Sequence, residues 1–420
     1  FGNLREVLDV VDRHTQPGPV RDGFYRRFLR TEMLGRLGGR KLLAAEPAFR
    51  TALLDEVRRL MEERFPAGVD AGLGAAVRAR AALVRAGRLE ELVALAEEMS
   101  QLTVDVQVNP VRVVPGAALA LTVQIDLLHR GQPLVLDRSD SGRWLLPRSV
   151  VGLAVSDTQR EVDPGELRGD LVVQHRELLD EWFLPAPLRP VLDPEARTVR
   201  WTGEVRLDPA SGAGGEPLRP GVHDLIGRVE VFGLTRNRRG HAPAETRESA
   251  APLLVDCDGR VHRLLVRAGG QLALEVDARH RRLARALAGA SVTATATGRV
   301  TAVLPVVWAR PPKVSLVLVG DDEPISVRLQ QPTPAGVEWS AAQAPRSRLR
   351  AGTYRAALTL SAPPRRVELE APVTVEPPRA GLGRTLRDAG GLLHHLPKLV
   401  ARRLPSPGRS RGSKGGGPRR

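Results

Sequence analysis

The sequence predicts a multidomain protein in which helices come first and β-structure follows. Apolar residues recur at helical spacing up to about residue 99, and at the two-residue spacing of strands from residue 101 onward. After about residue 377 the composition changes to Arg, Gly, Pro and Ser. We therefore expect a helical segment at 1–99, a β-sandwich at 100–250, a second β-sandwich at 251–377, and a basic tail at 378–420 that is partly amphipathic helix and then disordered.

About five helices are expected in the first segment, because each stretch carries one apolar face. Gly38-Gly39 and Gly87 are expected to end two of them. The predicted helices are 3–13, with Leu4, Val7, Leu8 and Val11 on one face; a helix capped by Asp22, with Tyr25, Phe28, Leu29, Met33 and Leu37 on one side; a helix with Phe49, Leu53, Val57, Leu60 and Met61 facing inward; 73–86; and 89–99.

The β-structure is predicted from alternating apolar residues between Pro- and Gly-rich turns, as at Pro115-Gly116. Candidate strands are 104–108, 119–125, 149–155, 170–175, 198–207, 222–233, 272–276, 354–360 and 367–375, with a polar break at 235–249. Short strands at this spacing favour immunoglobulin-like β-sandwiches. The turns before His223 and Tyr354 resemble each other, which favours two copies of one module.

The charge is concentrated in the tail. Residues 379–420 hold nine arginines and two lysines against one acid, Asp388, a net +10 of the chain's +15. The remainder is nearly balanced, unlike a nucleic-acid-binding domain, and the tail lacks interleaved aromatic residues. No nucleic-acid partner is expected. We expect the tail to attract an anionic cell-envelope polymer or an anionic membrane surface.

No complete catalytic or metal site is evident, so none is predicted. The single cysteine, Cys257, excludes an internal disulfide and a multi-thiolate zinc site. Asp256-Cys257-Asp258 is formally a metal-binding Asp-x-Asp, but the following Gly259 favours a turn, and Asp321-Asp322 also suggests an acidic turn. The histidines, including His262 and the pair His394-His395, have no second ligand at useful spacing.

Two groups of residues have open interpretations. Arg21, Arg26, Arg27 and Arg30 lie near the start of a helix, where they either contact phosphate or form a solvated face. The five tryptophans lie on or near strands, where core and sugar-stacking roles both exist; core positions are favoured for Trp144, Trp201 and Trp339.

Four stretches resemble the end of a bacterial family 2 glycosyltransferase catalytic domain: 1–9 (FGNLREVLD), 17–22 (PGPVRD), 32–34 (EML) and 78–89 (RARAALVRAGRL). The parent family 2 enzyme is actinobacterial-like, and the arrangement is similar to that of wall teichoic acid (polyribitol-phosphate) glycosyltransferases. In these proteins a GT-A catalytic domain is followed by a helical linker and tandem immunoglobulin-like modules. The likeness covers the whole chain in architecture, and in residues about the first 95.

The resemblance implies an inverting transfer from a nucleotide sugar, with Mn²⁺ or Mg²⁺ on the diphosphate and a carboxylate base. It also implies a homo-oligomer, with a trimer as the expected form. The residues that perform the reaction precede Phe1 in such proteins, so no catalytic residue is transferred to this chain. Only Arg21, Arg26, Arg27 and Arg30 are placed, as phosphate contacts bordering the donor or acceptor site.

The preferred hypothesis is therefore a C-terminal accessory and oligomerisation region of a family 2 glycosyltransferase that acts on a cell-envelope polymer. The parent protein is expected to be cytoplasmic and peripheral at the inner face of the cell membrane, since the chain shows neither a signal peptide nor an apolar span. The alternative is a non-enzymatic carbohydrate- or cell-wall-binding β-sandwich protein.

Overall fold

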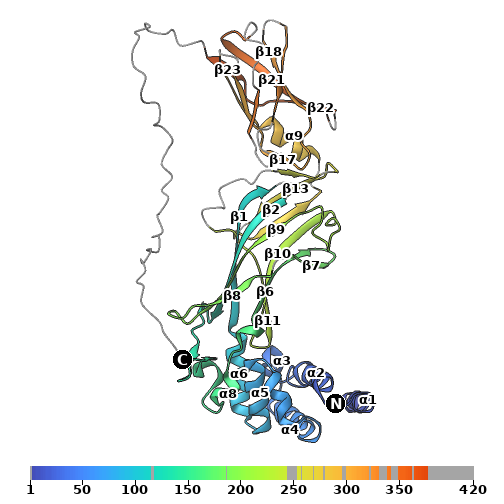
Figure 1. The fold of residues 1–420 in the computed structure, drawn as a ribbon, viewed down its shortest axis with the longest axis vertical. Coiled ribbons are helices and arrows are strands. Elements are labelled where there is room, and N and C mark those ends of the chain that lie inside the picture. Colours follow the sequence, from blue (N-terminus) through green and yellow to red (C-terminus); the bar gives the residue numbers. More distant parts are fainter. Residues whose placement is uncertain are drawn as a thin grey trace, which may run out of the picture. The chain divides into compact units, whose positions relative to one another are not determined.

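The computed structural model describes residues 2–114, 118–185, 187–243, 253–256, 258–267, 269–277, 280–295, 299–320, 323–330, 338–341, 349–361 and 364–376. Within these residues helices come first and β-sheets follow (Figure 1), which confirms the predicted order. Several predictions lie outside the described residues: those on Phe1, the Pro115-Gly116 turn, Cys257, Asp321-Asp322, His394-His395 and the whole tail 378–420. No helix in the described part is long and apolar enough to cross a membrane.

The N-terminal region is helical because its apolar residues form stripes that pack together, among them Leu8, Val57 and Leu92, each fully buried. Its elements are α1 (Gly2–His14), α2 (Pro19–Phe28), the π turn η1 (Leu29–Met33), α3 (Gly39–Leu43), α4 (Pro47–Arg64), the 3₁₀ turn η2 (Ala67–Gly72), α5 (Ala75–Arg85) and α6 (Leu89–Ser100). The helices predicted at 3–13, 73–86 and 89–99 correspond to α1, α5 and α6.

Two details of the predicted helices are wrong. The cap of α2 is Gly18, with Pro19 in the first turn, so Asp22 lies inside the helix and contributes a charge to its first turn. Phe49, expected to face inward, is 59% exposed, because it precedes the buried stripe that begins at Leu54.

Two sheets follow the helices. The first is antiparallel in the order β1-β2-β9-β8, with β3 paired to β2; the second has the order β17-β12-β13-β14-β10-β6-β7, with β11 paired to β10. Their bounds are β1 (Leu102–Val114), β2 (Ala118–His129), β3 (Gln132–Pro133), β8 (Arg189–Leu192), β9 (Val199–Leu207), β6 (Arg168–His175), β7 (Glu181–Phe183), β10 (Gly221–Val231), β11 (Leu234–Arg239), β12 (Leu253–Val255), β13 (Val261–Val266), β14 (Leu272–Val276) and β17 (Val306–Trp308).

The two sheets approach each other closely at Gly227 of β10. A Cβ atom there would lie 2.7 Å from Val106 of β1 and 2.8 Å from Ile125 of β2. Only a residue without a side chain fits between the sheets at this point. The sheets therefore pack face to face over a shared apolar layer.

The connection between β2 and β6 differs from the prediction. Residues 149–155 were expected to form a strand, and instead the helix α7 (Arg148–Val151) occupies the start of this stretch. A short apolar run fits either structure, and Pro147 before it favours a helix start. The connection also holds β4 (Asp137–Arg138), β5 (Trp144–Leu145), α8 (Asp157–Arg160) and η3 (Pro164–Glu166).

The position predicted as a boundary, residue 250, does not separate the sheets. Strands β13 and β14 lie after it, yet β14 is hydrogen-bonded to β10, with Gly221 opposite Val276. The polar break predicted at 235–249 begins as strand β11, paired to β10. Backbone pairing therefore continues across this point, because Leu272, Leu274 and Val276 supply apolar side chains to the first core.

A third sheet has the order β19-β18-β21-β23-β15-β16-β20, with β22 paired to β21. Its strands are β15 (Ser291–Thr295), β16 (Val300–Val303), β18 (Val314–Val319), β19 (Ile325–Leu329), β20 (Glu338–Ala341), β21 (Gly352–Ser361), β22 (Pro364–Glu368) and β23 (Val373–Glu376), and the amphipathic helix α9 (His280–Ala288) precedes them. Leu283 and Leu287 of α9 are buried with this sheet.

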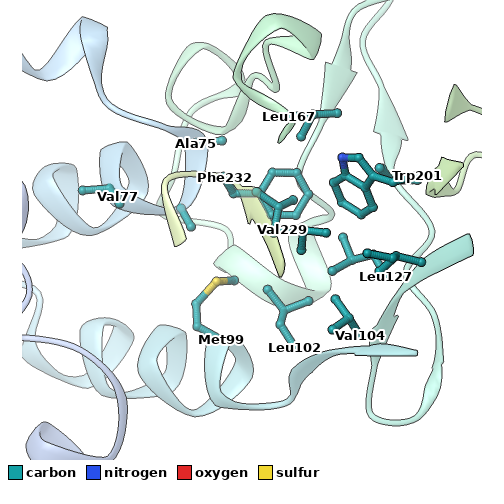
Figure 2. Close-up of a cluster of buried hydrophobic side chains, with 14 of the residues drawn as sticks. Ala75, Val77, Met99, Leu102, Val104, Leu127, Leu167, Trp201, Val229 and Phe232 are labelled. Atoms are coloured by element: carbon teal, nitrogen blue, oxygen red, sulfur yellow. The ribbon is translucent and has the colours of Figure 1, made fainter. Parts of the chain in front are cut away.

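The described residues form two apolar cores. One is continuous from the helices into the first two sheets, and Figure 2 shows Phe232 among helix and sheet side chains within it. The other belongs to the third sheet and α9. Strand β12 serves both, because alternate side chains point to opposite faces: Leu254 joins the first core, while Leu253 and Val255 join the second.

Candidate functional site

The π turn η1 is the irregular feature of the helical region. It continues α2 directly, and the Leu34 amide donates to the Leu29 carbonyl across 2.8 Å, five residues back. Leu29 and Met33 are buried, while Arg30 and Thr31 are exposed. Single π turns inside helices are frequent at functional sites. This turn lies within the stretch that the sequence singles out for its arginines.

A hollow of about 580 Å³ adjoins the π turn. Its lining comes from four separate parts of the chain: the π turn, the start of α5, the start of β6, and the hairpin between β10 and β11. The lining residues are Arg30, Thr31, Gly72, Gly74, Gly165, Glu166, Arg168, Glu230, Gly233, Leu234 and Thr235. The hollow therefore lies where the helices meet the second sheet.

The backbones of α5 and the hairpin touch beside this hollow. Phe232 and Gly233 form the hairpin turn with φ of 56° and 81°, and the Ala76 amide donates to the Phe232 carbonyl across 3.1 Å. A Cβ atom on Gly74 would lie 2.3 Å from the Gly233 nitrogen. Glycine at position 74 therefore allows the helix to begin directly against the turn.

Arginines hold the same junction through backbone carbonyls. Arg236 of β11 donates to the carbonyls of Met99 and Leu102, each across 2.8 Å, where α6 ends and β1 begins. Arg78 of α5 donates to the carbonyl of Glu161 in the connection before β6. Guanidinium groups at a helix C-terminus satisfy its unpaired carbonyls and oppose the dipole. The junction is therefore held by hydrogen bonds as well as by apolar packing.

Arg80 also donates to a backbone carbonyl, but from a buried position in the core. It is 5% exposed and donates to the Leu34 carbonyl, just after the π turn, across 2.9 Å. Burial, together with the charge of Arg236, lowers the pKa of Arg80 to about 10. The position of the π turn is thus fixed by a buried cation from α5.

The hollow itself contains charged side chains without partners. Among the described residues, Arg30, Glu166, Arg168 and Glu230 make no side-chain hydrogen bond and no ion pair. Burial raises the pKa of Glu166, the charge of Arg78 opposes this, and Asp163 adds to the rise. Unpaired groups with a shifted pKa in a hollow are typical of ligand sites.

The four arginines predicted to contact phosphate do not share one hollow. Arg21 pairs with Asp12 at 3.4 Å and donates to the Thr15 carbonyl across 3.0 Å. Arg26 donates to the Asp22 carbonyl across 3.1 Å, and Arg27 is exposed. Arg30, which lies on the π turn, lines the hollow.

The Asp-x-Asp sequence folds as a turn around a buried carboxylate. Asp256 accepts hydrogen bonds from the amides of Asp258 and Arg260, at 3.0 and 2.9 Å, and from the Arg260 guanidinium. Burial favours the neutral acid, but these bonds and one from His262 outweigh it and lower the pKa of Asp256. Its oxygens are therefore engaged within the turn. In the described part of the chain no group of three or more His, Cys, Asp or Glu is placed to hold a metal ion.

Sequence reasoning missed Glu166, Arg168 and Glu230. They come from η3, β6 and β10, and only the pairing of β6 with β10 places Arg168 opposite Glu230. No local pattern marks any of the three. The one signal in the sequence is the clustering of glycines around them, which does not specify a ligand.

Comparisons with known proteins relate the helical region to a defined family. Residues 1–96 match the family described as "Glycosyl transferase TarS linker domain". No curated protein matches the chain.

Solved structures were also compared. S. aureus TarS 217–571 is 11% identical, with 82% of this chain and 92% of that chain covered and a TM-score of 0.28. S. aureus TarS is 12% identical, with 81% and 57% covered and a TM-score of 0.29. A Bacteroides ovatus protein, the mixed-linkage glucan utilization locus SGBP-B in complex with a heptasaccharide, is 10% identical, with 66% and 60% covered and a TM-score of 0.21.

The chain thus spans 57% of the longer TarS structure. The likeness to wall teichoic acid glycosyltransferases that the sequence suggests is confirmed where the family match falls: residues 1–96 are similar to the TarS linker domain.

Proposed function

We propose that the chain is the accessory region of a family 2 glycosyltransferase that transfers a sugar from a nucleotide sugar to a cell-envelope polymer. The observation that carries the proposal is the match of residues 1–96 to the TarS linker family. In this proposal the helices connect a catalytic domain to the β-structure, and the β-structure positions the acceptor and assembles the enzyme. This segment, and not the sheets, indicates the function, because the sheets by themselves are compatible with many activities.

The shared core supports a rigid connection. Helix residues such as Leu60 and Leu92 belong to the same apolar core as Trp201 of β9 and Val229 of β10. A rigid connector fixes the distance between a catalytic centre and an acceptor-holding surface, which lowers the entropic cost of bringing them together.

The outer face of α1 and α2 supports a neighbouring domain. Val7, Val10, Val20 and Phe24 are 41%, 46%, 67% and 42% exposed, respectively. Exposed apolar side chains are found where another domain packs. We assign these residues to contact with the catalytic domain.

The remaining parts of the proposal follow from the resemblance. The β-structure is assigned to the immunoglobulin-like type, and the assembled enzyme to a homo-oligomer, with a trimer as the expected form. Mn²⁺ or Mg²⁺ and the nucleotide sugar bind the catalytic domain. The basic tail associates with an anionic polymer or the inner face of the membrane, which places the enzyme in the cytoplasm.

The test is the reading frame upstream of the codon for Phe1, followed by an assay of the full-length product. We expect a GT-A nucleotide-binding half and metal-dependent transfer from a nucleotide sugar to poly(ribitol phosphate). A signal peptide joined directly to this chain would overturn the proposal.

One observation favours the second candidate, a carbohydrate-binding protein without catalytic activity. Trp201, Trp308 and Trp339 are buried, whereas Trp182 on β7 is 37% exposed. An exposed tryptophan is suited to stacking on a sugar ring. The transfer assay of the full-length protein distinguishes the two candidates, because only the first predicts transfer of a sugar.

A further inference from the structure

Strand β6 borders a second hollow as well as the one beside the π turn. A second hollow of about 820 Å³ lies between β6, β8 and β9, and Arg168 lines both. The second is lined by Leu167, Arg168, Gly169, Asp170, Pro187, Leu188, Arg189, Pro190, Thr202, Gly203 and Glu204. We call the two hollows together the β6 groove.

Carboxylates and guanidinium groups alternate along this groove. Arg168 and Asp170 are two residues apart on β6, so they lie on the same face, roughly 7 Å apart. The register places Arg168 opposite Glu230 of β10, and Asp170 opposite Arg228. Glu166 precedes them in η3 and lines the same groove.

The carboxylates lack partners. In the described part of the chain, Glu166, Asp170 and Glu230 make no side-chain hydrogen bond and no ion pair. Burial raises the pKa of Asp170, and the charge of Glu230 adds to the rise, while Arg228 and Arg168 oppose it. Glu166 and Asp170 are half-buried and Glu230 is exposed, so water hydrates these carboxylates in the free chain, and a ligand hydroxyl that binds them replaces that water.

The charge of the groove decides the class of ligand. Its lining holds three cations, Arg30, Arg168 and Arg189, against four acids: Glu166, Asp170, Glu204 and Glu230. This nearly balanced charge gives no strong attraction to phosphate groups, whereas hydroxyls donate well to carboxylates and accept from guanidinium groups. Six glycines in the lining (Gly72, Gly74, Gly165, Gly169, Gly203 and Gly233) leave few side chains to fill the groove, as a chain-like ligand requires.

We propose that the β6 groove binds a neutral, hydroxyl-rich unit, a sugar or polyol residue, with Glu166 and Asp170 accepting from its hydroxyls. The source of that unit rests on the proposed function: it is the polymer that the enzyme modifies, or the sugar already attached to it. Binding there holds the acceptor beside the linker helices while its next unit reacts elsewhere. Glu166 and Asp170 are binding residues and take no part in the chemistry.

The experiment is saturation-transfer difference NMR on the whole 420-residue chain with ribitol, N-acetylglucosamine and inorganic phosphate as separate probes. We expect transfer to ribitol, to N-acetylglucosamine or to both, which identifies the source, and no displacement by phosphate. The double variant Glu166→Gln and Asp170→Asn should weaken binding about a hundredfold, since each lost charged acceptor costs about tenfold. Asp140→Asn, in the exposed turn between β4 and β5, is the matched control and should bind as the native chain does.

Three results overturn the proposal: no transfer to either neutral probe, equal binding by the double variant, or displacement by phosphate. Both substitutions keep side-chain size, and circular dichroism checks the fold of each variant. The outcome is independent of the catalytic assay. If the neutral probes bind in the groove but the reading frame encodes no nucleotide-binding half, the proposed function is wrong and the proposed binding site remains supported.

Discussion

The two apolar cores of the molecule are built in different ways. The core of the third sheet includes Trp308 and Trp339, packed edge to face with ring centroids 5.6 Å apart. The core that joins the helices to the first two sheets adds polar connections: Arg80 and Arg236 donate to backbone carbonyls, and beside them lies a groove with unpaired charges. Arg30, Arg168 and Glu230 are exposed, so water solvates them and a ligand can reach them. These accessible charges at the helix–sheet junction are the basis of the ligand site proposed there.

The largest expected effect tests whether the cores are separate. Trp339→Ala should destabilise the third sheet by about 3–5 kcal/mol, because a fully packed ring is replaced by a cavity. Differential scanning calorimetry should show one transition moving down while the transition of the helix-containing core stays in place. Trp201→Ala, in the other core, is the matched control and should move the opposite transition. A single transition shifted equally by both variants would contradict separate cores.

The next effect concerns the contact between α5 and the hairpin. Gly74→Ala should cost about 1–3 kcal/mol, because the added Cβ meets the Gly233 backbone at 2.3 Å. The control is Gly23→Ala in α2, where nothing lies within 4 Å of the added atom. That change should stabilise the protein by roughly 0.5–1 kcal/mol through helix propensity. Chemical denaturation measures the free energy of unfolding of both variants. Equal values would show that the close contact at Gly74 does not limit stability.

The arginine connection has an effect of similar size. Arg236→Met leaves the carbonyls of Met99 and Leu102 without their charged donor and should cost about 1.5–3 kcal/mol. Arg40→Gln, an exposed position in α3, should change stability by less than about 0.5 kcal/mol. Urea unfolding compares them, and a neutral Arg236→Met would mean that packing alone holds the junction.

The smallest effect is the dependence of stability on pH. Burial lowers the pKa of His223 and of His262, while bonds to the Arg219 carbonyl and to Asp256 oppose this. Both groups are neutral in the folded and unfolded states well above the unfolded pKa of about 6.5. As the pH falls through that value, the two histidines bind protons in the unfolded chain but remain neutral in the folded chain. The unfolded state is therefore favoured and the free energy of unfolding decreases.

Thermal melts at pH 7.5 and 5.5 should therefore show a lower melting temperature at pH 5.5. His223→Gln should reduce the difference, and His14→Gln, at an exposed position at the end of α1, should leave it unchanged. A difference of the same size in all three proteins would assign the effect to other groups.

Much of the architecture follows from periodicity in the sequence. The helical stripes of α1, α5 and α6, and the alternation in β6 and β9, are local properties of residues that face one core. The turn at Asp256 is also local, because its partners lie within six residues. Short or irregular elements were not predictable: α7 was expected as a strand, and the π turn has no local signature.

The groove could not be predicted from the sequence for a different reason. Arg30, Arg168 and Glu230 are far apart in the chain, and only the docking of α5 against the β10–β11 hairpin brings their elements together. Conversely, the arginines that are close in sequence separate in space, since Arg21 turns back to Asp12 while Arg30 faces the groove. Spacing along a helix specifies a face, and the ligand site depends on what packs against it.

The most direct test of the central claim, that the helix–sheet junction holds the acceptor, is the steady-state kinetics of the full-length enzyme carrying Glu166→Gln with poly(ribitol phosphate) as acceptor. We predict that KM for the acceptor rises about tenfold while kcat and the KM for the nucleotide sugar stay unchanged, because Glu166 contributes binding and no chemistry. An unchanged acceptor KM, or a loss confined to kcat, would contradict the account.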